Sequence, residues 1–135
     1  MTEKPILTLE DAKRIAAAAQ AEALRNDWRV VIAIVDDGGH LMYLQRNHDT
    51  QFGSVETAIR KAHAAVAFQR PTKVSEDAVL SGRLIHLSLP GVIPAEGGVP
   101  LQIDSVVVGG LGISGVRSSQ DGQIAAAGLA ALTVD

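Results

Sequence analysis

The sequence predicts an α+β domain in which an antiparallel sheet, built from two hairpins, is flanked by helices in the order α-ββ-αα-ββ-α. Two observations predict the hairpins. Residues 30–46 form two apolar runs around Asp36-Asp37-Gly38-Gly39, residue types that tolerate positive φ. A second pair of apolar runs meets at Asp104-Ser105. The helical patterns do not alternate with single strands, so the order does not indicate a parallel βαβ winding.

The first helix is expected over residues 9–24. Thr8, followed three residues later by Asp11, is typical of a capping box, and alanines recur after it at helical spacing. The return strand of the first hairpin spans residues 40–46. Arg46 is its last residue, so we expect the guanidinium at a strand end, beside a polar loop.

A second helix is expected between the hairpins, with Ser54 as its N-cap and Pro71 after its end. At about 100° per residue, Glu56 and His63 fall on one flank of its apolar stripe and Lys61 falls on the other. The helix therefore presents two different basic side chains in two directions.

A third helix is expected to start at Ser75 and to be closed by Pro90-Gly91. Residues 99–103 and 106–113 predict the strands of the second hairpin. The later strand opens with three valines and no alternation, so we expect it to be central and covered on both faces. Ser118 begins the last helical pattern, with an acid three residues on.

Composition places the 135 residues in one globular domain, residues 1–135, because 47% are hydrophobic and 20% are charged. A net charge of -3 and only four aromatic residues argue against a nucleic-acid or acidic-membrane partner. The absence of cysteine excludes disulfides and thiolate chemistry. No export signal or long apolar run is evident, so a cytoplasmic location is expected.

Two glycine-containing motifs and the four histidines are candidates for nucleotide, catalytic or metal sites. Residues 110–115 match G-x-G-x-x-G after a strand, but no second strand follows the last helix, so a dinucleotide fold is not expected. Ser114 lies in Gly112-Ile113-Ser114-Gly115-Val116, which lacks the last glycine of the G-x-S-x-G nucleophile elbow of hydrolases. The four histidines lack zinc-type spacing, so no metal site is expected, although one imidazole suffices to ligate a haem iron.

The candidate site combines anion binding, proton transfer and backbone donors. Arg46 and Lys61 would hold carboxylates, and His48 or His63 would act as ligand or base. Backbone N–H groups would come from two glycines and the last helix. The eight candidates are Arg46, His48 and Glu96 for catalysis, and Lys61, His63, Gly97, Gly98 and Gln120 for binding.

Each candidate also has a structural interpretation. His63 lies on the flank of the apolar stripe of the second helix, beside Glu56, so it could be a hydrogen-bonded structural histidine. Lys61 could be a solvated helix lysine. Glu96 could be a loop acid, and Asp121 could serve only as a helix cap.

Several segments stand in a joint order and spacing typical of one family: 9–12, 36–41, Arg46 with Asp49, 54–61, 97–101, and 108–115 with 120–121. They resemble the GlcG/HbpS family, which includes the C-terminal domain of PduO-type proteins. The resemblance covers nearly the whole chain. The chain departs from the family at Asn47-His48-Asp49, where a Met-Asp-Gly type sequence is common, and at His63, where a smaller or polar residue is usual.

The resemblance implies an antiparallel sheet flanked by helices and assembly into dimers or larger homo-oligomers. It also implies haem or corrinoid binding in certain members, and haem degradation in some. It places no axial haem ligand on a residue of this chain.

Three functions are carried forward. The leading hypothesis is a homo-oligomer that binds a small or planar ligand in a pocket across a subunit interface, formed by residues 46–54, the Gly97-Gly98 turn and the start of the last helix. The second is a cofactor-independent isomerase or hydrolase, in which Arg46 clamps a small carboxylated metabolite and a histidine or Glu96 moves the proton. The third is an assembly module without a ligand, suggested by the alanine-rich helix faces.

Overall fold

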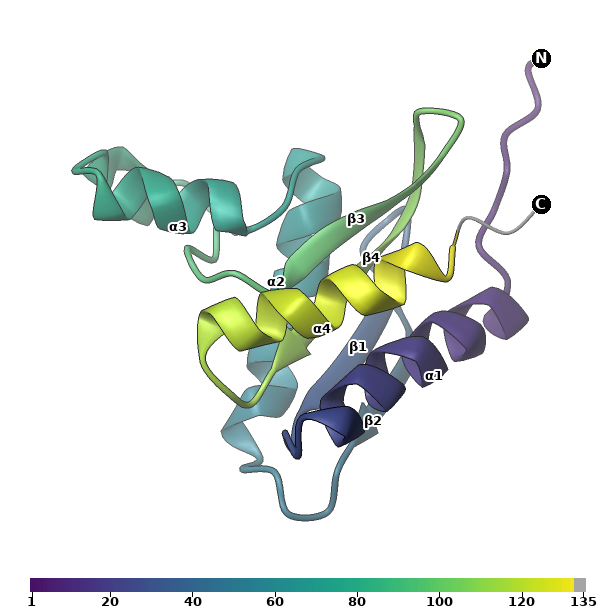
Figure 1. Cartoon of the computed structure of the whole chain (residues 1–135). Coiled ribbons are helices and arrows are strands. Elements are labelled where there is room, and N and C mark those ends of the chain that lie inside the picture. Colours follow the sequence, from purple (N-terminus) through teal and green to yellow (C-terminus); the bar gives the residue numbers. More distant parts are fainter. Residues whose placement is uncertain (133–135) are drawn as a thin grey trace.

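The computed structural model describes residues 1–132, and its helices and strands follow the predicted α-ββ-αα-ββ-α order (Figure 1). A short 3-10 helix, η1, adds one element that the sequence did not predict. The elements are α1 (Leu9–Arg25), β1 (Val31–Asp36), β2 (Leu41–Arg46), α2 (Gly53–Phe68), α3 (Lys73–Leu80), η1 (Leu84–Leu87), β3 (Gly98–Ile103), β4 (Val106–Ser114) and α4 (Ser118–Ala130).

The two hairpins form one antiparallel sheet with the strand order β2-β1-β4-β3. β4 pairs with both β1 and β3, which confirms the prediction that this strand is central. Asp104 and Ser105 both have positive φ, 51° and 67°, as the tight reversal between β3 and β4 requires. The hairpins therefore meet through β1 and β4, and β2 and β3 form the edges.

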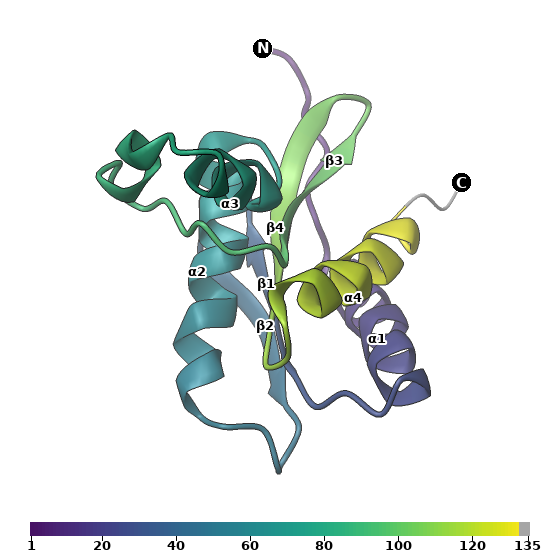
Figure 2. The ribbon, with the colours of Figure 1, turned by 60° about the vertical axis from the view of Figure 1, so that its left-hand side comes forward.

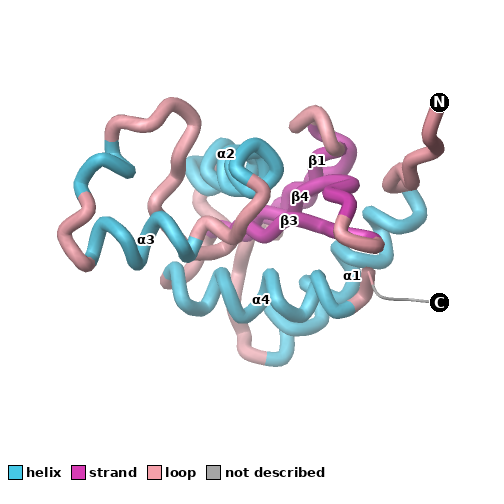
Figure 3. The backbone as a smooth tube through the Cα atoms, turned by 90° about the horizontal axis from the view of Figure 1, so that it is seen from above, coloured by secondary structure: helices cyan, strands magenta, loops and turns pink. Residues whose placement is uncertain are grey.

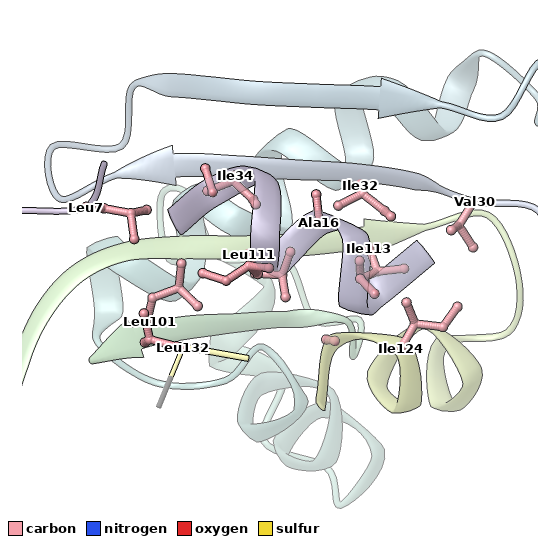
Figure 4. Packing of buried hydrophobic residues seen from close by; sticks show 14 of the residues in the cluster. Leu7, Ala16, Val30, Ile32, Ile34, Leu101, Leu111, Ile113, Ile124 and Leu132 are labelled. Carbon is pink, nitrogen blue, oxygen red and sulfur yellow. The ribbon is translucent and has the colours of Figure 1, made fainter. Parts of the chain in front are cut away.

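Helices cover both faces of the sheet (Figure 3). α1 and α4 pack together on one face, and α2 lies on the other. The larger apolar core fills the space between the sheet and the α1–α4 pair, as Figure 4 shows. Its fully buried large side chains are Ile15, Val30, Ile32, Ile34, Leu101, Val108, Leu111, Ile113 and Ile124.

The opposite face is built from small residues and glycines, which let α2 approach the sheet closely. A Cβ placed on Gly112 would lie 2.0 Å from the carbonyl oxygen of Ala58, and one on Gly110 would lie 2.4 Å from that of Ala62. Only residues without a side chain can occupy these positions at this spacing. Part of the G-x-G-x-x-G motif is thus a helix-packing surface.

The N-cap residue was predicted correctly for one helix out of four, although α4 does begin at Ser118 as predicted. Thr8 and Asp11 form the expected capping box of α1, with Asp11 N–H donating to Thr8 Oγ1 at 3.1 Å. The other three predicted caps were wrong, because Ser54, Ser75 and Ser118 all lie inside their helices. The serine hydroxyl of Ser54 accepts a hydrogen bond from Gln51 Nε2 instead, and that of Ser75 lies 3.1 Å from His86 Nδ1.

The predicted third helix is shorter than expected, since α3 ends at Leu80 and η1 follows after Gly82, whose φ is +98°. Residues 73–95 form an arm that stands away from the sheet beyond α2 (Figure 2). Within these 23 residues, all of them described, Ser75 alone is buried. Over residues 1–132, no helix combines the length and the apolar character needed to cross a bilayer.

Candidate functional site

α2 carries two basic side chains that are two residues apart and point in different directions. Lys61 is buried, with a relative exposure of 2%, whereas His63 is exposed. Two residues along a helix correspond to a rotation of about 200°, so the two side chains leave nearly opposite flanks. The predicted separation of Lys61 and His63 on α2 is therefore present, but Lys61 is not a solvated helix lysine.

Lys61 binds three oxygens from three segments that are distant in the sequence. Its Nζ donates to the carbonyl oxygens of Glu96 and Ile113, both at 2.9 Å, and to Asp121 Oδ2 at 3.0 Å. An ammonium has three N–H donors, so all of them are used within the chain. We call Lys61, Asp121 and these two carbonyl groups the lysine knot.

Asp121 completes the lysine knot from the first turn of α4. Its Oδ2 accepts from Lys61, and its Oδ1 accepts from the backbone N–H of Val116 at 3.3 Å. Burial disfavours the ionised carboxylate and raises the pKa of Asp121 to about 6, although the Lys61 ammonium opposes this rise. The lysine knot connects α2, β4 and α4, so it holds these three elements in place relative to one another.

The predicted glycine donors lie against this knot and are not open to a ligand. Both Gly97 and Gly98 are buried, and a Cβ on Gly97 would come within 2.9 Å of Lys61 Nζ. The N–H of Gly98 donates to Thr72 Oγ1 at 2.9 Å. Ligand binding by these groups stays a prediction that would require the chain to open here.

Glu96 and Gln120 also lie at the start of α4. Glu96 gives its carbonyl oxygen to Lys61 and its N–H to Glu76 Oε1 at 2.9 Å. Burial raises the pKa of its own carboxyl group. Gln120 Oε1 accepts from the backbone N–H of Arg117 at 3.3 Å, so this side chain caps α4.

Arg46 and His48 lie in a third place, at the far edge of the sheet. Arg46 ends β2 opposite Val31, and its Nη1 donates to the carbonyl oxygens of Thr50 at 2.8 Å and His48 at 3.4 Å. β1 and β4 separate it from Gly98 on β3, which is roughly 14 Å for three strand spacings.

The expected single hollow between Arg46 and the Gly97-Gly98 turn is therefore divided. The cause is the strand order, which puts the two hairpin ends on opposite edges of the sheet. Arg46 and Glu96, the clamp and proton carrier of the enzyme hypothesis, do not converge. Their catalytic roles stay predictions.

His63 borders two adjoining hollows on the outer side of α2. One has a volume of about 370 Å³ and is lined by Glu56, Ile59, Arg60, His63, Gly91 and Ile93. The other has about 310 Å³ and is lined by Asp37, Gly38, Gly39, His63, Val66 and Ala67. Pockets for small ligands commonly span about 300–1,000 Å³, so each is large enough to hold one. We call the pair the His63 hollow.

The imidazole of His63 rests on the turn of the first hairpin. A Cβ on Gly39 would lie 2.5 Å from Cδ2 and 2.8 Å from Nε2 of the ring, so this edge faces the turn and Nδ1 lies on the other side. In the part of the chain that is described, the ring has no hydrogen-bond partner. The structural interpretation of a bond to Glu56 is not realised, because Glu56 Oε2 pairs with Arg60 at 2.7 Å.

Residue-by-residue reasoning missed three contributors to the His63 hollow. Arg60 lies one helical turn from both Glu56 and His63, a spacing that could have revealed it. Gly39 was interpreted only as a turn residue. Ile93 comes from the returning end of the arm, and no local pattern could have placed it beside α2.

Comparison with known proteins gives a consistent result. A family model described as "Haem degrading protein HbpS-like" matches residues 7–130. Protein GlcG of Escherichia coli K12 is 40% identical over 114 residues, which cover 84% of this chain and 85% of GlcG.

Two crystal structures of similar proteins show the same architecture. A PduOC:heme complex has a TM-score of 0.85 and 34% identity, covering 97% of this chain and 98% of that one. The crystal structure of HbpS has a TM-score of 0.85 and 31% identity, and the match covers 96% of this chain and 92% of HbpS. The resemblance and the fold class inferred from the sequence are both confirmed.

Proposed function

Since this chain belongs to the HbpS-like family, we propose that it is a cytoplasmic protein that binds a planar tetrapyrrole, haem or a corrinoid, in the His63 hollow. The observation that carries the proposal is an exposed imidazole, without a partner among residues 1–132, between two adjoining hollows. The haem complex of the similar PduOC protein supports the same class of ligand.

The residues around the His63 hollow suit such a ligand. A neutral imidazole is a common axial ligand of haem iron, and His63 has a ring nitrogen turned away from the Gly39 turn. Ile59 and Ile93 supply apolar surface for a flat ring. Bound haem would supply an iron centre whose properties depend on this axial ligand.

Hemin titration of the purified full chain tests the proposal. We expect a Soret shift that saturates at a fixed stoichiometry, and a loss of affinity of about tenfold or more in His63→Ala, which removes the axial nitrogen. His48→Ala tests the other candidate histidine, which lies exposed in the loop after β2 and does not line the His63 hollow, so this variant should keep the wild-type affinity. Undiminished hemin affinity in His63→Ala would exclude the proposed site.

We also propose that the arm mediates contact with a second copy of this chain. Leu80, Leu84, Ile85 and Leu87 are 58–77% exposed, and large exposed apolar patches mark interaction sites. Between Asp77 and Glu96, Arg83 is the single charged residue apart from His86, which argues for an apolar partner.

A second copy offers such a surface. A hollow of about 460 Å³ on β3 and α4 is mostly apolar: Pro71, Val99, Pro100, Leu129 and Leu132 line it together with Gln69, Arg70 and Gln102. Reciprocal insertion of two arms would satisfy the closed symmetry that most homo-oligomers adopt. This chain therefore carries both an apolar arm and a largely apolar hollow that would receive the arm of a second copy.

Light scattering after size-exclusion chromatography tests this contact. Leu84→Asp with Leu87→Asp should lower the oligomer mass, whereas Leu24→Asp, on an exposed residue of α1, should leave it unchanged. A wild-type monomer, or an oligomer that survives the arm variant, would refute the proposed contact.

A further inference from the structure

Each end of the His63 hollow carries an ion pair, but among the described lining residues only one end has a Lys or Arg side chain. One end carries Arg60, whose guanidinium faces Glu56 from the next turn of α2. The other end carries Asp37, whose carboxylate pairs with Lys4. A ligand with an anionic edge would therefore meet a cation that can be freed at one end and a carboxylate at the other.

The ion pair between Arg60 and Glu56 is weak and open to exchange. Arg60 Nε and Nη2 both bind the same oxygen, Glu56 Oε2, at 2.8 and 2.7 Å. The side chains are 62% and 71% exposed, so water screens their attraction. A ligand carboxylate that uses both of its oxygens would match the planar guanidinium better than this arrangement does.

We propose that Arg60 is the anion-binding residue of the His63 hollow, that Glu56 competes with the ligand for it, and that the ligand carries carboxylate groups on the edge that faces Arg60. The inference rests on the proposed function of the hollow and adds the orientation and charge of the ligand. Glu56 then sets affinity by occupying Arg60 in the free protein.

The test compares hemin, which has two carboxylates, with its dimethyl ester in the same detergent-containing buffer. Arg60→Gln should weaken hemin binding about 3- to 5-fold, and Glu56→Gln should strengthen it about 2- to 3-fold, as expected for exposed ion pairs. The ester should bind with an affinity that neither substitution changes. Lys73→Gln and Asp77→Asn are matched controls, because they remove an exposed pair with the same four-residue spacing from α3.

The outcomes separate this inference from the proposal beneath it. Hemin binding that depends on His63 but not on Arg60, with equal affinity for the ester, would overturn the role of Arg60 alone. Hemin binding that is absent, or indifferent to His63, would overturn the proposed function and this inference together. In the double variant of Glu56 and Arg60, the gain from Glu56→Gln should disappear, because no guanidinium remains to be released.

Discussion

The inner and outer flanks of α2 use basic side chains in opposite ways. On the inner flank, Lys61 is buried and has all three donors bound by oxygens of the same chain. On the outer flank, His63 is exposed and rests only on a glycine turn. Loss of the buried ammonium would cost stability, whereas the exposed ring makes no hydrogen bond within residues 1–132. One helix thus separates a side chain that holds the fold from one that lines the His63 hollow.

The largest expected effect comes from breaking the lysine knot. Lys61→Met leaves Asp121 buried without its cation, so the free energy of unfolding should fall by about 3–5 kcal/mol in urea denaturation. Replacing Asp121 by Asn in the same protein should recover part of this loss. Lys73→Met is the control, and it should leave the free energy of unfolding nearly unchanged because its pair with Asp77 is exposed.

The packing of α2 on β4 should show the next largest effect. Gly112→Ala would place a Cβ 2.0 Å from the Ala58 carbonyl oxygen, and we expect a loss of about 1–3 kcal/mol from overpacking. Gly53→Ala, at the open start of α2, has no atom within 4 Å of its new Cβ and should be neutral or stabilising. Equal thermal midpoints for the two variants would contradict the close approach of α2.

On the outer flank, Gly39→Ala should affect binding more than stability. Gly39 has φ +83°, which costs a residue with a Cβ about 1–2 kcal/mol, and the new methyl group would displace the His63 ring. We expect weaker hemin binding with a modest fall in the unfolding midpoint. Gly82→Ala, at a similar φ of +98° with open space around it, separates backbone strain from displacement of the ring.

The last test is the pH dependence of the inner flank. Burial raises the pKa of Asp121 from 3.8 in the unfolded chain to about 6 in the folded chain. Between about pH 4 and pH 6 the folded chain therefore binds more protons at this carboxyl group than the unfolded chain does. Stability relative to Asp121→Asn should therefore be greatest below about pH 4 and decrease as the pH rises through 6. A relative stability that increases over this range would mean that the pairing with Lys61 outweighs the cost of burial.

Local signals in the sequence were enough for the sheet but not for the lysine knot. The turn residues at 36–39 and 104–105 determine both hairpins, because their backbone conformations suit few residue types. Helical periodicity placed Lys61 on a flank of α2, but it carries no information about Glu96, Ile113 and Asp121, which lie 35 to 60 residues away.

The prediction of the helix caps is wrong for a related reason. A serine near a helix start favours a cap, yet Ser54 and Ser75 have partners of their own, in Gln51 and His86. The true caps of these two helices, Phe52 and Thr72, make no side-chain hydrogen bond to the helix. Thr72 instead receives the N–H of Gly98, a contact between segments that only the folded chain brings together.

The strand order also constrains the sequence of events during synthesis. β1 is synthesised before its inner neighbour β4, and α1 is synthesised before its packing partner α4. Before β4 is made, β1 can pair only with β2 and pack against α1 and α2, so the pairing that joins the two hairpins is still missing. The inner edge of β1 therefore stays unpaired until residues 106–114 have been synthesised.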